Sequence, residues 1–199
     1  MRSFALHFVI KTLMATEIYL VRHGETEENH RNILQGHLPG HLTKEGIAQA
    51  QQLRDELAQT HFDTLLCSDL KRCVDTAAIL NEPHGLTPEY TTLLRERDWG
   101  LFTGMDILKA RTMIDDRAET VESMFHRADL LLNDILRRFP DRRILAVSHG
   151  LFCRVIQAAV LGKTIRDIPR MHNAEVRIVE LVPPFRFSIQ DEETGATAN

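Results

Sequence analysis

Two distant segments of this chain end in a histidine followed by a glycine. Leu20-Val21-Arg22-His23-Gly24 and Val147-Ser148-His149-Gly150 each place this pair after an apolar run. Such a run is typical of a buried strand, and the glycine lets the backbone turn sharply beside a ligand. Ligands of parallel α/β sheets bind outside the carboxyl ends of the strands. The sequence therefore predicts that both histidines share one site, and Arg22 indicates that the ligand is anionic.

The residue types around these histidines suit a phosphate group. Arginine stays protonated at neutral pH, and its planar fork binds phosphate oxygens in pairs. Besides Arg22, Arg72 stands in the first turn of a predicted helix, where it adds to the positive end of the helix dipole. Asn29 and the backbone of Gln35-Gly36 are candidate neutral donors. Together they predict a phosphate-binding pocket.

A histidine can also take up a phosphoryl group covalently. Its neutral ring nitrogen attacks phosphorus, provided that the other nitrogen is held by a fixed acceptor such as a backbone carbonyl. We expect His23 to play this part and His149 to donate a hydrogen bond to a phosphoryl oxygen, in a neutral or protonated form. The leaving alkoxide needs a proton, and a carboxylic acid can supply it and then activate water. Glu96 and Asp98 are the candidates.

The segments that carry these residues resemble those of the histidine phosphatase (phosphoglycerate mutase-like) superfamily. One Arg-His-Gly would be a weak signal, but five blocks occur in the family's order between residue 18 and about residue 160. They are Arg22-His23-Gly24-Glu25-Thr26 with Asn29, Gln35-Gly36 with Leu42-Thr43-Lys44-Glu45-Gly46, Ser68-Asp69-Leu70-Lys71-Arg72 with Thr76-Ala77, Leu94-Arg95-Glu96 with Gly100 and Gly104, and Val147-Ser148-His149-Gly150.

This resemblance implies the fold class and a role for each site residue. The expected fold is a three-layer α/β/α sandwich with a mostly parallel central sheet. The implied catalytic residues are His23 as nucleophile, Glu96 as proton donor, and His149. The implied phosphate-binding residues are Arg22, Asn29, Gln35, Gly36, Arg72 and His149. Glu25, which follows the nucleophile, is a further candidate acid beside Glu96 and Asp98.

The chain departs from the family's pattern around the substrate rim. Glu28 stands where a tryptophan is frequent, Pro39 and His41 replace an aspartate and a proline, and Cys67 replaces a serine. None of these changes removes a catalytic group. We therefore expect the chemistry to be retained and the shape of the rim to differ.

Hydrophobic periodicity predicts the elements that position these residues. Strands are expected at 18–21, 62–67, 144–148, 174–182 and 185–189, with a weak one at Glu89-Tyr90. Helices are expected at 43–59 with Thr43 as N-cap, from Ser68 or Asp69 to about Leu80, near Asp106, and at 120–139 and 151–161. Trp99 and Phe102 are interpreted as packing residues, and Ser68 as a helix cap or a ligand contact. Alternating strands and helices predict a parallel sheet covered on both faces.

Composition excludes several classes of protein. The chain has 199 residues, 43% of them hydrophobic, and a net charge of −4, which argues against a nucleic-acid partner. No apolar stretch is long enough to span a membrane. Three cysteines without a CxxC pair indicate a reduced, cytoplasmic setting. The ten histidines show no ligand spacing, so we expect neither a metal nor another cofactor.

We expect a single domain over residues 14–190, an N-terminal extension over 1–13 and a C-terminal tail over 191–199. The stretch from Gly104 to Glu119 is short for a capping insertion, which favours a small, open site and a phosphomonoester hydrolase. The alternatives are a cofactor-dependent phosphoglycerate mutase and a weakly catalytic module that recognises phosphate. The expected partner is a small phosphorylated metabolite, and a homodimer is compatible with the sequence.

Overall fold

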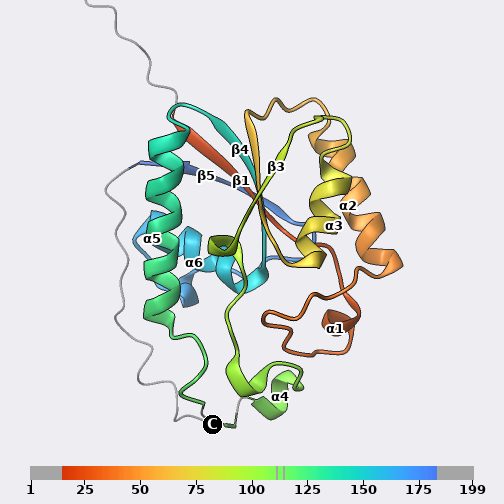
Figure 1. Ribbon diagram of the computed structural model, residues 1–199, viewed down its shortest axis with the longest axis vertical. Coiled ribbons are helices and arrows are strands. Elements are labelled where there is room, and N and C mark those ends of the chain that lie inside the picture. The colour runs from red at the N-terminus through yellow and green to blue at the C-terminus, as the bar shows by residue number, and fades with distance from the viewer. Residues whose placement is uncertain (1–14, 111, 114, 183–199) are drawn as a thin grey trace, which may run out of the picture.

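The computed structural model describes residues 15–110, 112–113 and 115–182, and a five-stranded sheet lies at its centre. Its order is β3-β2-β4-β1-β5 (Figure 1). Strands β1 (Thr16–Arg22), β2 (Thr64–Ser68), β3 (Pro88–Thr91) and β4 (Arg143–Ser148) are parallel. Strand β5 (Val176–Leu181) runs antiparallel to β1 at one edge. The prediction of a mostly parallel sheet is confirmed.

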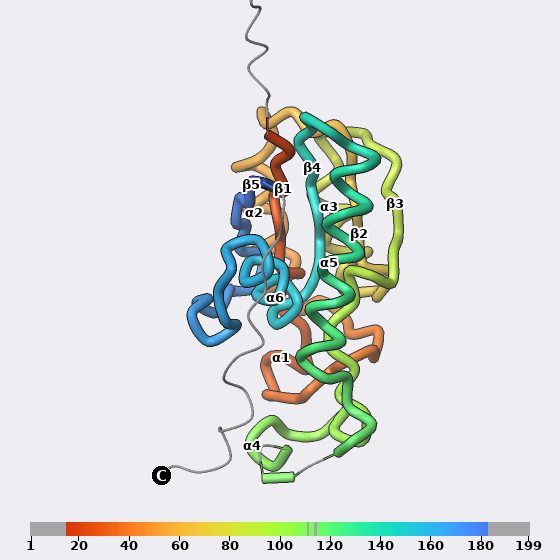
Figure 2. The backbone as a smooth tube through the Cα atoms, turned by 90° about the vertical axis from the view of Figure 1, so that its left-hand side faces the viewer, coloured from red at the N-terminus to blue at the C-terminus, as the bar shows by residue number. Residues whose placement is uncertain are grey.

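Helices cover both faces of this sheet, which confirms the three-layer architecture. Helices α2 (Lys44–Leu57) and α3 (Lys71–Leu80) lie on one face, and α5 (Val121–Arg138) and α6 (Gly150–Leu161) lie on the other (Figures 1 and 2). Successive side chains of a strand point to opposite faces. Leu20 accordingly packs in the core beneath α5 and α6, whereas its neighbour Val21 packs beneath α2 and α3. Among the described residues, no helix is long and apolar enough to cross a membrane.

Two short helices lie beyond the carboxyl ends of the parallel strands (Figure 2). Helix α1 (Glu27–His30), which the sequence pattern did not predict, begins with a capping box between Thr26 and Asn29. Helix α4 (Ile107–Ala110) follows the irregular segment after β3. Short 3₁₀ turns occur at Thr92–Leu94, Gly100–Phe102 and Ile165–Asp167. These loop elements surround the sheet edge at which the two His-Gly pairs end.

The N-cap predicted for α2 is confirmed, whereas the N-cap predicted for α3 is wrong. Thr43 caps α2 as predicted, because its Oγ1 accepts a hydrogen bond from the Gly46 amide at 2.9 Å. The prediction that Ser68 or Asp69 caps α3 is wrong, since Leu70 is the N-cap and makes no side-chain cap bond. The side chains of Ser68 and Asp69 serve long-range partners, His149 and Arg95, instead. The predicted strand at 185–189 and both predicted terminal segments lie outside the described residues.

Two glycines, Gly24 and Gly46, allow the segment after His23 to lie directly against α2. A Cβ added at Gly46 would lie 2.1 Å from the backbone oxygen of Glu25, and one added at Gly24 would lie 2.4 Å from the Gly46 oxygen. Both distances are far inside van der Waals contact, and both obstacles are backbone. The two segments can therefore approach this closely only where neither residue carries a side chain.

This contact makes the outcome of Gly46→Ala a sharp test. Helix propensity alone predicts that alanine stabilises α2 by about 1 kcal/mol. The clash with Glu25 predicts the opposite, a loss of about 1–3 kcal/mol in the free energy of unfolding. Urea denaturation measures the sign, with Gln51→Ala at an exposed position of the same helix as a control that stays near the wild-type value. A Gly46→Ala protein more stable than the wild type would contradict the packing.

Candidate active site

A cavity of about 640 Å³ opens at the carboxyl edge of the sheet. Seven of the eight predicted site residues line it: Arg22, His23, Asn29, Gln35, Gly36, Arg72 and Glu96. The eighth, His149, is fully buried beside them, with its ring centroid 5.3 Å from that of His23. Strand pairing explains this meeting. Arg22 and Ser148 are opposite in the register of β1 and β4, so the next residue of each strand is a histidine.

The ring of His23 has one defined free nitrogen. Its Nδ1 lies 2.7 Å from the backbone oxygen of Gly24, which only accepts, so Nδ1 carries the proton and donates it. Nε2 is then the atom with a lone pair. Burial, followed by the nearby charges of Arg72 and Arg22, lowers the pKa of His23 well below its usual value of 6.5. The ring is therefore neutral at physiological pH, as nucleophilic attack requires.

The backbone of His23 is held from a segment that sequence reasoning missed. The Asn173 side-chain Nδ2 donates to the His23 carbonyl at 3.1 Å and to Asn29 Oδ1 at 3.2 Å. The Ala174 amide donates to the same carbonyl at 3.2 Å. Because Asn29 Oδ1 is engaged, Nδ2 is the end of that amide that can donate to a ligand. Asn173 precedes the edge strand β5 and belongs to no local pattern that could have indicated its role.

His149 is held between two side chains. Its Nδ1 accepts a hydrogen bond from Arg72 Nε at 3.1 Å, so Nε2 carries the proton and donates to Ser68 Oγ at 2.8 Å. Burial, followed by the nearby charge of Arg72, lowers the pKa of His149 well below 6.5. The ring is thus neutral, and in this arrangement it orients the Arg72 guanidinium. Its predicted bond to a phosphoryl oxygen stays a prediction.

Arg22 and Arg72 supply the positive charge beside His23. The Arg72 side chain is 1% exposed, and its guanidinium donates to the backbone oxygens of Leu38 and Gly36, the latter at 2.9 Å. Arg22 donates from Nη1 to the Met171 oxygen at 2.6 Å, while its buried Nε has no hydrogen-bond partner within the described chain. Burial lowers the pKa of both groups, yet arginine stays charged in proteins. Both charges therefore favour an anion in the cavity.

Of the candidate acids, the structure places Glu96 in the cavity. Its Oε1 accepts the Phe152 amide and its Oε2 accepts the Leu151 amide, each at 3.2 Å, so the carboxyl group sits on the N-terminus of α6. Asp98 instead caps the Gly100 amide, and Glu25 accepts from the Thr43 hydroxyl. Neither of those carboxylates lines the cavity.

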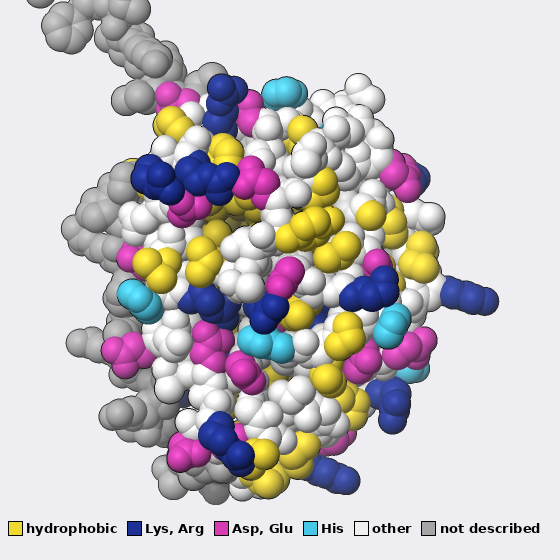
Figure 3. Space-filling view, in the orientation of Figure 1, with side chains coloured by type: hydrophobic (Ala, Val, Ile, Leu, Met, Phe, Trp, Pro, Cys, Tyr) yellow, Lys and Arg dark blue, Asp and Glu magenta, His cyan; other side chains and the backbone are white. Residues whose placement is uncertain are grey.

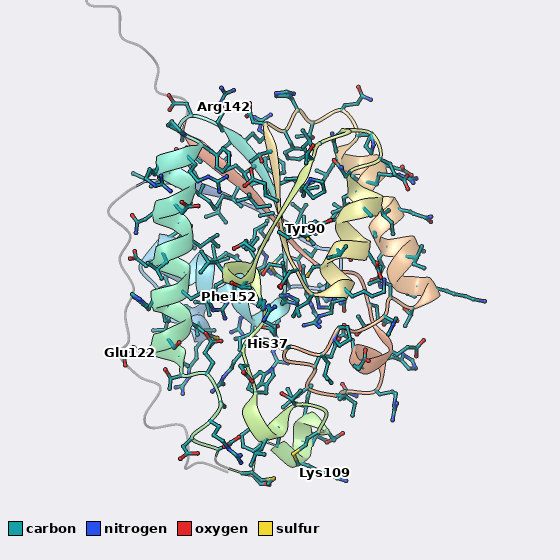
Figure 4. The ribbon with its side chains drawn as sticks, viewed as in Figure 1. His37, Tyr90, Lys109, Glu122, Arg142 and Phe152 are labelled. Carbon is teal, nitrogen blue, oxygen red and sulfur yellow. The ribbon has the colours of Figure 1, made fainter. Side chains whose placement is uncertain are left out.

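The loop after α1 closes the inner end of the cavity. Gly36 has a positive φ of 49°, which turns the chain so that its carbonyl meets Arg72. Gln35 is buried, and its Oε1 has no partner within the described chain. His37 places Nε2 3.0 Å from the backbone oxygen of Glu96 and lies between Phe152 and Lys109 in the view of Figure 4. The loop and the Glu96 segment therefore contact each other directly.

The outer wall of the cavity contains two aromatic residues that the sequence analysis interpreted as packing residues. Trp99 and Phe102 line it rather than serving as packing residues alone, together with Ile33, Leu34, Ile107 and Met113. The described residues between Arg97 and Ala118 thus form one side of the cavity even though this segment is short. Sequence patterns could not show this, because the segment has little regular structure and reaches the site only through tertiary contacts.

The three cysteines lie in the interior of the protein. Cys67, Cys73 and Cys153 are buried and free. Cys73 Sγ packs 3.4 Å from His149 Nε2, and burial raises its pKa well above that of an ordinary thiol. Within the described parts of the chain, no three His, Cys, Asp or Glu side chains are grouped as metal ligands. Cys73 therefore contributes packing around the His149 ring.

Comparison with known proteins identifies the family. A family model of the histidine phosphatase superfamily (branch 1) matches residues 18–184. A broad-specificity phosphatase of Saccharomyces cerevisiae is 37% identical over 107 residues, which cover 51% of this chain and 46% of that protein. A probable phosphoglycerate mutase of Proteus mirabilis is 30% identical over 161 residues, covering 73% of this chain and 75% of that one. The matched part of the yeast protein is thus about half of its length.

A solved structure agrees with these sequence matches. YhfR of Bacillus stearothermophilus superposes with a TM-score of 0.78 at 26% identity, covering 89% of this chain and 96% of that one. The fold, the cavity and the matched residues together define the class. The chain belongs to the histidine phosphatase superfamily, branch 1.

The buried neutral histidines predict a loss of stability in mild acid. Their pKa values are lowered in the folded state, so between pH 6.5 and those lowered values the unfolded chain binds more protons. Stability is therefore complete above about pH 6.5 and falls as the pH decreases, by at most about 1.4 kcal/mol per pH unit for each histidine. Urea denaturation between pH 5 and 7.5 measures this slope.

Single substitutions test whether His23 and His149 cause the pH dependence of stability. His23→Asn and His149→Gln should each flatten it, whereas His126→Gln, at an exposed position on α5, should leave it unchanged. Equal slopes in all four proteins would show that the two rings are not held neutral.

Proposed function

We propose that this protein hydrolyses phosphomonoesters through a phosphohistidine on His23. The observation that carries the proposal is the shared cavity. It brings together the unprotonated Nε2 of His23, the guanidinium groups of Arg22 and Arg72, and the carboxyl group of Glu96. The phosphatase names of relatives support it. The substrate class proposed is a small phosphorylated metabolite, and the buried free thiols support a cytoplasmic setting.

The reaction follows from these positions. The lone pair of His23 Nε2 attacks phosphorus, and the bond from phosphorus to the ester oxygen breaks. The departing oxygen takes a proton from the carboxyl group of Glu96. Arg22 and Arg72 offset the charge on the phosphoryl oxygens throughout. Glu96, now a carboxylate, removes a proton from water, whose oxygen attacks phosphorus. The nitrogen–phosphorus bond then breaks, which restores neutral His23 and releases phosphate.

Removal of the nucleophile tests the covalent route. His23→Asn should lower the hydrolysis of p-nitrophenyl phosphate about a thousandfold or more, because no other group can take up the phosphoryl group. The wild type, quenched during turnover, should carry phosphate that is labile in acid and stable in base. Activity should survive exhaustive chelation, and His126→Gln should retain wild-type rates.

Two outcomes would redirect this assignment. The name of the Proteus mirabilis relative favours a mutase as the second candidate. Rapid interconversion of 3- and 2-phosphoglycerate with a bisphosphate primer, and negligible hydrolysis of aryl phosphates, would establish that reaction instead. Phosphate binding without any turnover by the wild type would point to a recognition module.

The role of Glu96 is tested by the leaving group. Glu96→Gln keeps the shape of the side chain but removes the acid. An alkoxide must be protonated as it leaves, whereas p-nitrophenolate leaves well without a proton. The variant should therefore lose at least about tenfold more kcat/KM with an alkyl phosphate than with p-nitrophenyl phosphate, within the range of acid catalysis. Asp98→Asn is the matched control, and equal losses on both substrates by Glu96→Gln would contradict the assignment.

A further inference from the structure

The phosphate pocket accounts for only the inner part of the cavity. The remainder is lined by large apolar side chains: Ile33, Leu34, Trp99, Phe102, Ile107 and Met113. A volume of about 640 Å³ is that of a site for a whole small molecule, not for phosphate alone. Figure 3 shows apolar side chains gathered at the lower end of the molecule, where Figure 1 places α4. We call the six apolar side chains on the cavity lining the apolar wall.

The apolar wall is a built structure. The segment after α1 pairs with the segment before α4 through the Ile33–Asp106 bridge. The Leu34 amide donates to the Met105 oxygen at 2.9 Å, and the Gly104 amide donates to the Leu34 oxygen at 2.7 Å. The main chain on both sides is therefore held in place by hydrogen bonds, which fixes the positions of Ile33, Leu34 and Ile107 on the cavity lining.

The charged residues on the same lining are directed elsewhere. The guanidinium of Arg97 lies 4.5 Å from the centroid of the Trp99 ring, and its Nε donates to the Glu119 oxygen. Asp115 accepts the Leu101 amide through one carboxylate oxygen and Arg117 through the other.

The two remaining cations belong to other parts of the cavity. Arg154 donates to the backbone oxygens of Ile168 and Ile165. Arg170 lines the cavity beside Met171, whose backbone oxygen accepts a hydrogen bond from Arg22. The hydrogen bonds of Arg97, Asp115 and Arg154 thus brace the neighbouring loops.

We infer that the preferred substrates are phosphate monoesters of apolar alcohols or phenols rather than of sugars. The inference rests on the proposed function. An alkyl chain or aromatic ring on this wall would leave water and gain from each carbon buried. The hydroxyl groups of a sugar would lose their hydration against this wall, where the indole N–H of Trp99 is the single side-chain hydrogen-bond donor. The apolar wall therefore discriminates by the polarity of the leaving group.

A series of primary alkyl phosphates from ethyl to octyl tests this inference. Burial of one methylene group corresponds to about a fourfold gain, so kcat/KM should rise about threefold to fourfold per added carbon until the wall is covered. Glycerol phosphate should be a poorer substrate than propyl phosphate, which has the same carbon skeleton. A flat series, or a preference for glycerol phosphate, would overturn the inference while leaving the phosphatase reaction intact.

Two adjacent residues of α4 provide a matched pair of variants. Ile107 lines the cavity, whereas Leu108 is 68% exposed. Ile107→Asn should reduce the gain per carbon, whereas Leu108→Asn should keep the wild-type slope. Thermal denaturation confirms that both variants fold. Equal slopes in the two variants would contradict the role of the wall.

A binding measurement separates the inference from the proposed function. Non-hydrolysable alkylphosphonates of the same lengths are titrated into the wild type by calorimetry, which requires no turnover. The Kd should fall about threefold to fourfold per carbon. That result without hydrolysis of any ester would contradict the proposed function but support the apolar wall. A Kd independent of length would overturn the inference whether or not the protein is a phosphatase.

Discussion

Two guanidinium groups buried at the edge of a sheet are the constraint on which the site depends. Arg72 is 1% exposed, and Arg22 is largely enclosed, with no carboxylate bonded to either side chain among the described contacts. Charges so placed are costly unless they are hydrogen-bonded or neutralised. Backbone carbonyls of the Gly36–Leu38 loop and of Met171 meet part of that need. An anionic ligand would meet the rest, which links the stability of the site to its chemistry.

The same charges set the state of both histidines. A buried imidazole resists protonation, and nearby cations oppose it further, with Arg72 beside both rings and Arg22 beside His23. His23 is kept neutral with its lone pair on Nε2 because the Gly24 carbonyl takes the Nδ1 proton. His149 is neutral and accepts from Arg72, so it serves as a partner of the cation and not as a second charge. One electrostatic arrangement thus produces a nucleophile and an anion-binding group.

Local sequence patterns predicted the central sheet and its covering helices, but not the connections between them at the site. The Thr43 cap, the long helix α5 and the alternation of strands and helices follow from short-range rules of capping and periodicity. Ser68 and Asp69 look like helix caps for the same reason. In the structure the Ser68 hydroxyl is instead hydrogen-bonded to His149, and the Asp69 carboxylate to Arg95. Only the folded sheet brings these partners near. Helix α1 was missed because its single turn rests on a capping box and on the Asn29–Asn173 contact.

The sequence by itself determined the kind of chemistry, because the residue types carry it. Arginines are cations wherever they lie, and a histidine that ends a strand before glycine stands at the ligand edge of a parallel sheet. Only the tertiary structure decided which nitrogen of His23 is free, that Glu96 and not Asp98 reaches the cavity, and that an apolar wall completes it. The last two features arise from contacts between segments far apart in the chain, whereas the first depends on how the folded site orients the His23 ring toward the adjacent Gly24 carbonyl. No local pattern of residues specifies the direction in which such a side chain points.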